Sequence, residues 1–170
     1  MSPTYKVNID KERCIACYTC EVACKQEHGL PVGPRLIQVI TSGPKMVGQS
    51  LRMDFIPMLC MQCGNPACIN ACPEDAIHKR EDGIVLIDED ACTGCKLCID
   101  ACPLGAMQYY PEKNIAVKCT YCVERIDKGK LPSCVLCCPT RALKFGDVNE
   151  GAAATRKKRA ERTAREASYT

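Results

Sequence analysis

The sequence predicts an α+β fold built from four similar units, each consisting of a short strand, a cysteine-rich loop, one or two helical turns and a second short strand. Three observations predict it. Cysteine accounts for 17 of the 170 residues, a share that calls for disulfides or metal ligation. Sixteen of these cysteines fall into four groups that each end in C-x-x-x-C. A β-prone run precedes every group.

The first unit starts with the β-prone run YKVNID. Its group, CIACYTCEVAC, contains Cys14, Cys17, Cys20 and Cys24. The following residues, 25–55, contain seven glycines and prolines between Gly29 and Gly48 and show no clear period. We interpret this stretch as an insertion that either covers a partner or links strands. Four methionines in and after it are expected to fill core space: Met46, Met53, Met58 and Met61.

The second and third units resemble each other closely. The run MDFIPML precedes CMQCGNPACINAC, and the run IVLID precedes CTGCKLCIDAC. In both units the third cysteine is expected to open a short helix, which the proline after the fourth cysteine then ends. Gly83 marks a turn between strands. The cysteines of these two units are Cys60, Cys63, Cys68, Cys72, Cys92, Cys95, Cys98 and Cys102.

The fourth unit follows the run IAVK and has a longer gap between its second and third cysteines. It contains Cys119, Cys122, Cys134 and Cys138. When the four C-x-x-x-C endings are aligned, Cys138 falls in the column of the fourth cysteines and Cys137 in the column of three alanines. We therefore expect Cys137 to be a small, buried, alanine-like residue that is not a ligand. The gap VERIDKGKLPS is either a docking loop or a solvated loop.

Three explanations for the cysteines compete: disulfides, zinc and iron–sulfur clusters. The N-terminal residues contain no apolar leader segment, cleavage site or twin arginine, and no apolar run approaches the roughly 18 residues of a membrane helix. We therefore expect a cytoplasmic protein without a membrane span, whose thiols stay reduced. The spacing C-x-x-C-x-x-C-x-x-x-C-P is typical of bacterial ferredoxins. Taken alone, the fourth group would also suit a zinc ribbon.

Catalytic and nucleic-acid functions find little support. The chain has no Ser/His/Asp set, no phosphate-binding loop and no G-x-G-x-x-G, so no catalytic site of its own is expected. His28 is expected in a surface loop without a catalytic role. The net charge of +3 combines a C-terminal tail, residues 151–170, with a net charge of +4, and a body of −1. A body of this charge does not suggest nucleic-acid binding.

The motifs CMQCGNPACINACP and KCTYCVERIDKGKLPSCVLCCPTRAL give the chain a family resemblance over residues 5–147. It resembles the four-cluster, ferredoxin-like electron-transfer subunits of molybdenum and tungsten pterin oxidoreductases. These include the iron–sulfur subunits of the dimethyl sulfoxide reductase family and the small subunits of aldehyde oxidoreductase-type tungsten enzymes. The resemblance implies two nested modules, each like a bacterial ferredoxin with two 4Fe-4S clusters. An inner module, residues 55–110, would interrupt an outer module formed by residues 1–54, insertion included, and 111–150. Residues 151–170 would form a helical or disordered basic tail.

The resemblance implies four 4Fe-4S clusters held by sixteen cysteines. In two-cluster ferredoxins the fourth cysteine of a motif ligates the other cluster. Applied here, the rule places Cys60, Cys63 and Cys68 with Cys102, and Cys92, Cys95 and Cys98 with Cys72. In the outer module it places Cys14, Cys17 and Cys20 with Cys138, and Cys119, Cys122 and Cys134 with Cys24.

The leading functional hypothesis is an electron-transfer subunit that passes single electrons between a large molybdenum or tungsten pterin catalytic subunit and a redox partner. That redox partner would be a further subunit or another copy of the chain. The alternative is a free polyferredoxin that carries electrons between enzymes. A third class, an iron–sulfur sensor or assembly factor, would not need four clusters. Purification distinguishes the first two hypotheses, because only a subunit is recovered in a stoichiometric complex.

Overall fold

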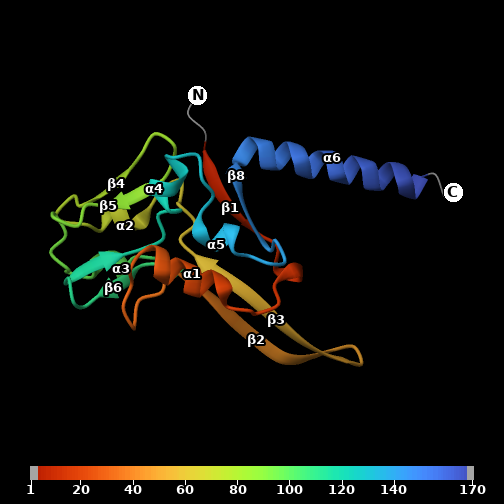
Figure 1. Cartoon of the computed structure of the whole chain (residues 1–170), viewed down its shortest axis with the longest axis horizontal. Coiled ribbons are helices and arrows are strands. Elements are labelled where there is room, and N and C mark those ends of the chain that lie inside the picture. Colours follow the sequence, from red (N-terminus) through yellow and green to blue (C-terminus); the bar gives the residue numbers. More distant parts are fainter. Residues whose placement is uncertain (1–3, 168–170) are drawn as a thin grey trace.

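The computed structural model describes residues 4–167. Short strands and short helices alternate through most of the chain, and Figure 1 shows how they are arranged. The strands are β1 (Tyr5–Ile9), β2 (Ile37–Val47), β3 (Ser50–Leu59), β4 (Ile77–Lys79), β5 (Val85–Ile87), β6 (Gln108–Tyr110), β7 (Ile115–Val117) and β8 (Leu143–Asp147). The helices are a 3-10 turn (Lys11–Arg13), α1 (Thr19–Glu27), α2 (Ala67–Asn70), α3 (Leu97–Asp100), α4 (Val123–Ile126), α5 (Ser133–Leu136) and α6 (Val148–Ala167). The predicted α+β class is confirmed.

The first and last strands pair with each other. β1 and β8 are antiparallel, with Tyr5 opposite Asp147 and Ile9 opposite Leu143. Val7 on β1 is buried in a core that also contains Leu143 and Tyr121. Segments from opposite ends of the chain therefore lie side by side, as Figure 1 shows.

The middle of the chain forms two short antiparallel hairpins, β4–β5 and β6–β7. The expected turn at Gly83 lies between the first pair, with φ +84°, a conformation that glycine adopts without strain. A second, smaller core contains Ile77, Val85, Met107 and Ala116, which come from both hairpins and the segment before β6.

The stretch interpreted as an insertion without period is mostly a long hairpin. β2 and β3 pair from Ile37 opposite Leu59 out to Val47 opposite Ser50, with a register irregularity between Ser42 and Lys45. The hairpin base alternates as half-buried strands do, because Ile37 and Val39 are buried while Gln38 is exposed. The rest of the hairpin projects from the body (Figure 1).

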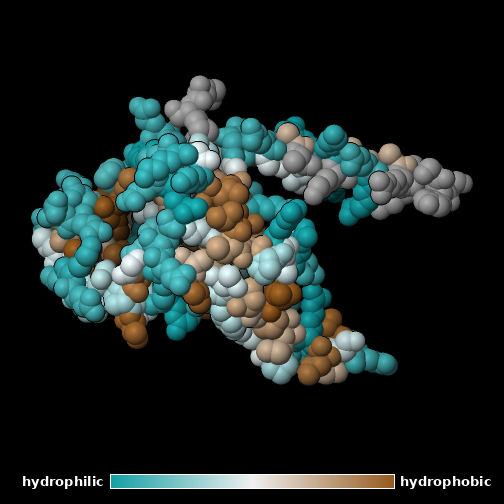
Figure 2. All heavy atoms as spheres, viewed as in Figure 1, coloured by the Kyte–Doolittle hydropathy of each residue, from teal (hydrophilic) through white to brown (hydrophobic). Residues whose placement is uncertain are grey.

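The expectation that four methionines fill the core is wrong for three of them. Met46, Met53 and Met61 are exposed, and Met58 is half-buried. Met46 and Met53 lie on the projecting hairpin, which pairs only with itself among the described strands and so offers their side chains no second layer to pack against. The apolar side chains of this hairpin are visible at the surface in Figure 2.

The length of the helix that carries each third cysteine depends on the residue after the fourth cysteine. α2, α3 and α5 are single turns of four residues, and a proline follows the fourth cysteine soon after each. Lys25 stands at that position after Cys24, and α1 continues to Glu27 for nine residues. Since proline restricts the preceding residue and offers no N–H, its absence lets the helix continue.

The C-terminal tail is a helix. α6 starts directly after β8, where Asp147 accepts hydrogen bonds from the backbone N–H groups of Asn149 and Glu150 at 2.7 and 3.3 Å. From there it extends away from the body (Figure 1). Across residues 4–167, no helix combines the length and the apolar character needed to cross a membrane.

Candidate metal centres

The four cysteine loops share one unusual backbone feature. The residue before the second cysteine has a positive φ in every group: Ala16 (54°), Gln62 (49°), Gly94 (72°) and Tyr121 (56°). Non-glycine residues rarely adopt this conformation, and they keep it only where the surroundings impose it. At Gly94 a Cβ atom would lie 2.2 Å from the backbone oxygen of Asn114, so only glycine fits. The repeat seen in the sequence is therefore also a repeat of backbone conformation.

The third cysteine of each group lies within the first two residues of a short helix, as expected. Cys20, Cys68, Cys98 and Cys134 occupy the second positions of α1, α2, α3 and α5. The fourth cysteine follows one turn later. The loop and helix thus present three thiols to one side and carry the fourth further along the helix axis.

Two sets of four thiols each line a cavity. A first set lines one small cavity, and a fourth set lines another. Each set draws three cysteines from one group and one from a distant group. The first set is Cys14, Cys17, Cys20 and Cys138; the fourth set is Cys72, Cys92, Cys95 and Cys98.

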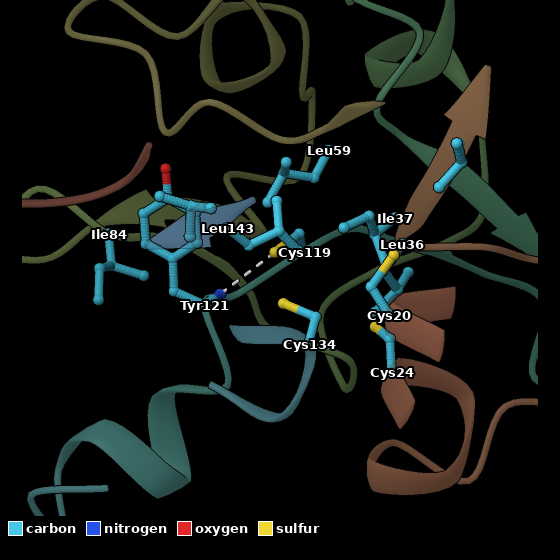
Figure 3. Close-up of a cluster of buried hydrophobic side chains, with 12 residues drawn as sticks. Cys20, Cys24, Leu36, Ile37, Leu59, Ile84, Cys119, Tyr121, Cys134 and Leu143 are labelled. Atoms are coloured by element: carbon cyan, nitrogen blue, oxygen red, sulfur yellow. Dashed lines mark hydrogen bonds between the residues drawn. The ribbon is translucent and has the colours of Figure 1, made fainter. Parts of the chain in front are cut away.

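The other eight thiols fall into two sets whose members influence one another's pKa. Burial raises the pKa of Cys134, and Cys119, Cys122 and Cys24 raise it further. Burial likewise raises the pKa of Cys60, where Cys63 and Cys102 add to the increase. We name Cys24, Cys119, Cys122 and Cys134 the second set and Cys60, Cys63, Cys68 and Cys102 the third set. Figure 3 shows Cys24, Cys119 and Cys134 of the second set beside Cys20 of the first.

The thiols occupy environments that oppose spontaneous ionisation. Burial raises the pKa of Cys20 to about 11, of Cys98 to about 11 and of Cys119 to about 12. Burial acts in the same direction on Cys138, but backbone hydrogen bonds at Leu143, Ala142 and Thr140 outweigh it and lower the pKa of this thiol. A metal that takes thiolate ligands must therefore drive deprotonation at most of these positions.

Backbone N–H groups also point at several sulfur atoms. Ala106 donates to Cys102 Sγ at 3.4 Å, Ala116 to Cys92 Sγ at 3.5 Å, and Tyr121 to Cys119 Sγ at 3.4 Å (Figure 3). Hydrogen bonds of this kind stabilise negative charge on a ligating sulfur and tune its metal.

Two sequence-based expectations need correction here. Cys137 is exposed, not buried, because it ends α5 on the side that faces solvent. His28 does not lie in a surface loop. It caps α1, it is half-buried, and its Nε2 lies 3.5 Å from Cys122 Sγ. Burial lowers the pKa of His28, which favours the neutral imidazole.

Two buried polar residues, Lys118 and Gln62, lie among the thiols, and no motif in the sequence predicts their burial there. Lys118 is 2% exposed, and its Nζ lies among the acceptor groups of Val85, Cys119 and Gln62. Burial lowers the pKa of Lys118, whereas the thiolates of Cys60 and Cys119 raise it. Lysine is almost never fully buried unless it is paired, so nothing in the pattern of the sequence predicts this placement.

A set of four thiols matches the ligands of a cubane cluster, which takes one thiolate at each of its four irons. Within residues 4–167, no three His, Cys, Asp or Glu side chains converge on a point suited to a single metal ion. Comparison with protein families gives the same class of cofactor. Residues 51–148 match the 4Fe-4S dicluster domain family, and residues 11–27 match a 4Fe-4S binding domain. The chain is thus an iron–sulfur protein of the 4Fe-4S class, and its sixteen grouped cysteines suffice for four such clusters.

Comparison with individual proteins defines the family further. The chain is 43% identical over 157 residues to the probable anaerobic dimethyl sulfoxide reductase chain YnfG of Escherichia coli, an alignment that covers 88% of this chain and 77% of that protein. It is 38% identical over 143 residues to the thiosulfate reductase electron transfer subunit PhsB of Salmonella typhi (83% and 74%). It is also 38% identical over 152 residues to one of the chains of the polysulfide reductase of Wolinella succinogenes (88% and 80%). The chain belongs to this family of iron–sulfur electron-transfer subunits. The relatives support the dimethyl sulfoxide reductase side of the expected resemblance and give no support to tungsten aldehyde oxidoreductases.

Proposed function

We propose that the chain carries four 4Fe-4S clusters and conducts electrons to or from a separate molybdenum pterin catalytic subunit. The observation that carries this proposal is the exchange of fourth cysteines. In all four sets, three thiols from one group gather with the fourth thiol of another group, as two adjacent clusters in a ferredoxin require. Each set would ligate one cluster, and Cys137 would ligate none.

The residues present suit these clusters. Thiolates are the soft ligands that iron–sulfur clusters take, and backbone N–H groups donate to sulfur in several sets. Clusters bound here would supply reversible one-electron transfer. The chain itself holds the thiols at fixed positions, buries them and sets the charge around them.

Interactions between the sets support one linear order of sites: first, second, third, fourth. Cys20 of the first set raises the pKa of Cys134 in the second set, and Cys60 of the third set raises the pKa of Cys119 in the second set. Helices α2 and α3, which pack together, carry cysteines of both the third and fourth sets. All thiols of the second set are buried, whereas the two end sets each include an exposed thiol, Cys17 or Cys95. This pattern suits a conductor that is insulated in the middle and open at its ends.

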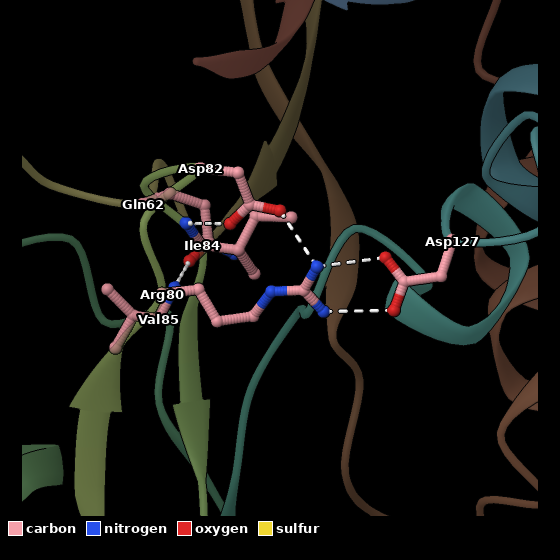
Figure 4. A network of polar contacts seen from close by, with 6 residues as sticks. All are labelled: Gln62, Arg80, Asp82, Ile84, Val85 and Asp127. Atoms are coloured by element: carbon pink, nitrogen blue, oxygen red, sulfur yellow. Dashed lines mark hydrogen bonds and ion pairs between the residues drawn. The ribbon is translucent and has the colours of Figure 1, made fainter. Parts of the chain in front are cut away.

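The same arrangement supports the proposed modules. Residues 1–54 and 111–150 would form the outer module, and residues 55–110 the inner one. The larger core includes β1, β8 and α5 residues, while the smaller core is built around β4–β7. An ion pair joins the two parts, because Arg80 after β4 donates to both carboxylate oxygens of Asp127 after α4, at 3.0 and 2.9 Å (Figure 4).

The β2–β3 hairpin supports docking to the catalytic subunit. Its outer half exposes large apolar side chains, among them Leu51 (69%) and Met46 (65%), together with Val47 and Met53. Contiguous apolar side chains at a protein surface are typical of interaction sites. A freely diffusing polyferredoxin, the alternative function, has no need for such a projection. The cytoplasm is part of the proposal as the compartment, since reduced thiols are needed for cluster assembly.

Anaerobic purification of the chain, co-expressed with a molybdenum pterin subunit from the same organism, tests the proposal. We expect a stoichiometric complex that contains molybdenum and about 16 iron atoms per copy of this chain. Leu51→Asp combined with Met46→Asp should release the large subunit, whereas Val32→Asp, at an exposed position outside the hairpin, should not. A chain with four clusters that never binds a large subunit would leave the free polyferredoxin.

A further inference from the structure

Lys118 occupies the junction between the second and third sets. It follows β7 and directly precedes Cys119, and only 2% of it is exposed. Four thiols raise its pKa: those of Cys60, Cys119, Cys68 and Cys63. Three of them belong to the third set and one to the second.

Burial lowers the pKa of Lys118, but the three hydrogen-bond partners of its nitrogen all suit the charged form. Nζ donates to the carbonyl oxygen of Val85, to that of Cys119 at 3.1 Å and to Oε1 of Gln62 at 3.4 Å. All three partners are acceptors, and an ammonium group offers three N–H donors. A neutral amine would present a lone pair to one of these acceptors. The geometry therefore describes a buried ammonium with every donor used.

Gln62 holds this arrangement in place. Its Nε2 donates to the carbonyl oxygen of Cys119 at 2.7 Å. Its Oε1 accepts from the backbone N–H of Val85 at 2.9 Å, the hydrogen bond drawn in Figure 4. These two bonds fix the amide so that its oxygen, not its nitrogen, faces Lys118. Gln62 belongs to the loop of the third set and Cys119 to the second set. The ammonium is thus tied to both sets through buried hydrogen bonds.

We infer that the Lys118 ammonium is a fixed positive charge that raises the reduction potentials of the two middle clusters relative to those at the ends. The inference rests on the proposed four-cluster function. One-electron reduction adds one negative charge to a cluster, and a buried positive charge nearby stabilises that product more than the oxidised form. Within a protein of effective dielectric constant near 20, a unit charge several ångströms away changes an equilibrium constant by about tenfold or more. For a one-electron couple, tenfold corresponds to about 59 mV.

Lys118→Met tests the inference, because methionine is unbranched and nearly as long as lysine but carries no charge. In the anaerobically purified complex, potentiometric titration with each cluster followed by its electron paramagnetic resonance signal should show two clusters that become harder to reduce by about tenfold, or about 59 mV. The other two potentials should stay unchanged. Lys118→Arg, which keeps the charge, should retain all four potentials.

Lys79→Met is the matched control. Lys79 Nζ also donates to loop carbonyls of the third set, at 2.9 Å to Cys63 and 2.8 Å to Gly64, but this side chain is exposed. Water and salt screen an exposed charge, so its removal should shift no potential appreciably. Four unchanged potentials in Lys118→Met, or an equal shift of all four, would overturn the inference.

Iron content separates the possible failures. A wild-type protein with fewer than four clusters would refute the proposed function itself, whatever Lys118 does. If the Lys118→Met protein loses iron, Lys118→Gln is measured in its place. Glutamine keeps an N–H donor without the charge, so the same two potentials should be lowered. If Lys118→Gln retains the wild-type potentials with full iron, the hydrogen bonds matter and the charge does not, and the inference is wrong.

Discussion

The two adjacent cysteines of the fourth group offer a sharp test of the ligand sets. Cys138 lines the cavity of the first set, while Cys137 is exposed at the end of α5. Cys138→Ala should therefore remove or damage one cluster of four, lowering iron from about 16 to about 12 atoms per chain if the whole cluster is lost. Cys137→Ala changes the neighbouring residue in the same way and should keep the full content.

The structure also sets the expected cost in stability. A bond between residues 20 and 138 closes a loop of about 120 residues, and by chain entropy such a closure stabilises a fold by about 4 to 5 kcal/mol. The second set closes almost the same loop, because Cys24 and Cys134 lie four residues from Cys20 and Cys138. Losing the first link alone should therefore cost only about 2 to 3 kcal/mol, whereas losing both links in Cys24→Ala with Cys138→Ala should cost at least about 5 kcal/mol.

Iron and sulfide analysis, cluster spectroscopy and anaerobic urea unfolding of the three variants are the measurements. Loss of a cluster from Cys137→Ala, with full content in Cys138→Ala, would refute the alignment and the ligand sets together. An unfolding free energy that falls equally in Cys138→Ala and in the double variant would refute the argument that two links close one loop.

Three further outcomes are expected. Chelation of iron should unfold the outer module, because Cys24, Cys119 and Cys134 of the second set lie within the larger core; retained near-ultraviolet circular dichroism would argue otherwise. Glu27 on α1 accepts hydrogen bonds from Ser133 and from Arg125, the latter at 3.0 Å, and the Ser133 hydrogen bond is the main cause that lowers its carboxyl pKa. Since a lowered pKa stabilises the fold above the unfolded value of about 4.3, Glu27→Gln should unfold more easily at pH 7, and the difference from wild type should vanish as the pH falls below about 4. Deleting residues 151–170 removes a net charge of +4 and should weaken complex formation at low salt but not at high salt, as pull-down assays against ionic strength would show; equal binding at low salt would indicate a solvated tail.

Much of the fold follows from the cysteine repeat. The loop and the short helix with its third cysteine recur because one backbone conformation recurs, down to the positive φ of Gln62 and Gly94. The β-prone run MDFIPML lies within β3 as expected, but β2 and its pairing with β3 were not predicted, because Gly43, Pro44 and Gly48 resemble strand breakers. A two-stranded ribbon tolerates them, since a bulge and free edges leave no ladder bond to lose there.

The buried polar groups could not be predicted from the sequence. The placement of Lys118 depends on Gln62 and Val85, which come from another unit and meet it only in the folded chain. His28 reaches Cys122 for the same kind of reason, because α1 packs against α5 and the segment before it. Spacing predicts which cysteines share a site, but it carries no information on which polar side chains lie between the sites.

The pairing of β1 with β8 has a consequence during synthesis of the protein. In the inner hairpins the two paired strands are only a few residues apart in the sequence, but β1 cannot pair until the ribosome has made Leu143. At about 5 to 20 residues per second, a ribosome needs roughly 7 to 27 s for that interval. During this time both edges of β1 are unpaired, and Cys138, which lines the same cavity as the thiols of the first group, has not yet been made. Open edges invite pairing with other chains, and unligated thiols are open to oxidation. The N-terminal segment of the nascent chain is therefore the part most prone to mispairing and oxidation. A chaperone that shields residues 5–24 until release would protect it.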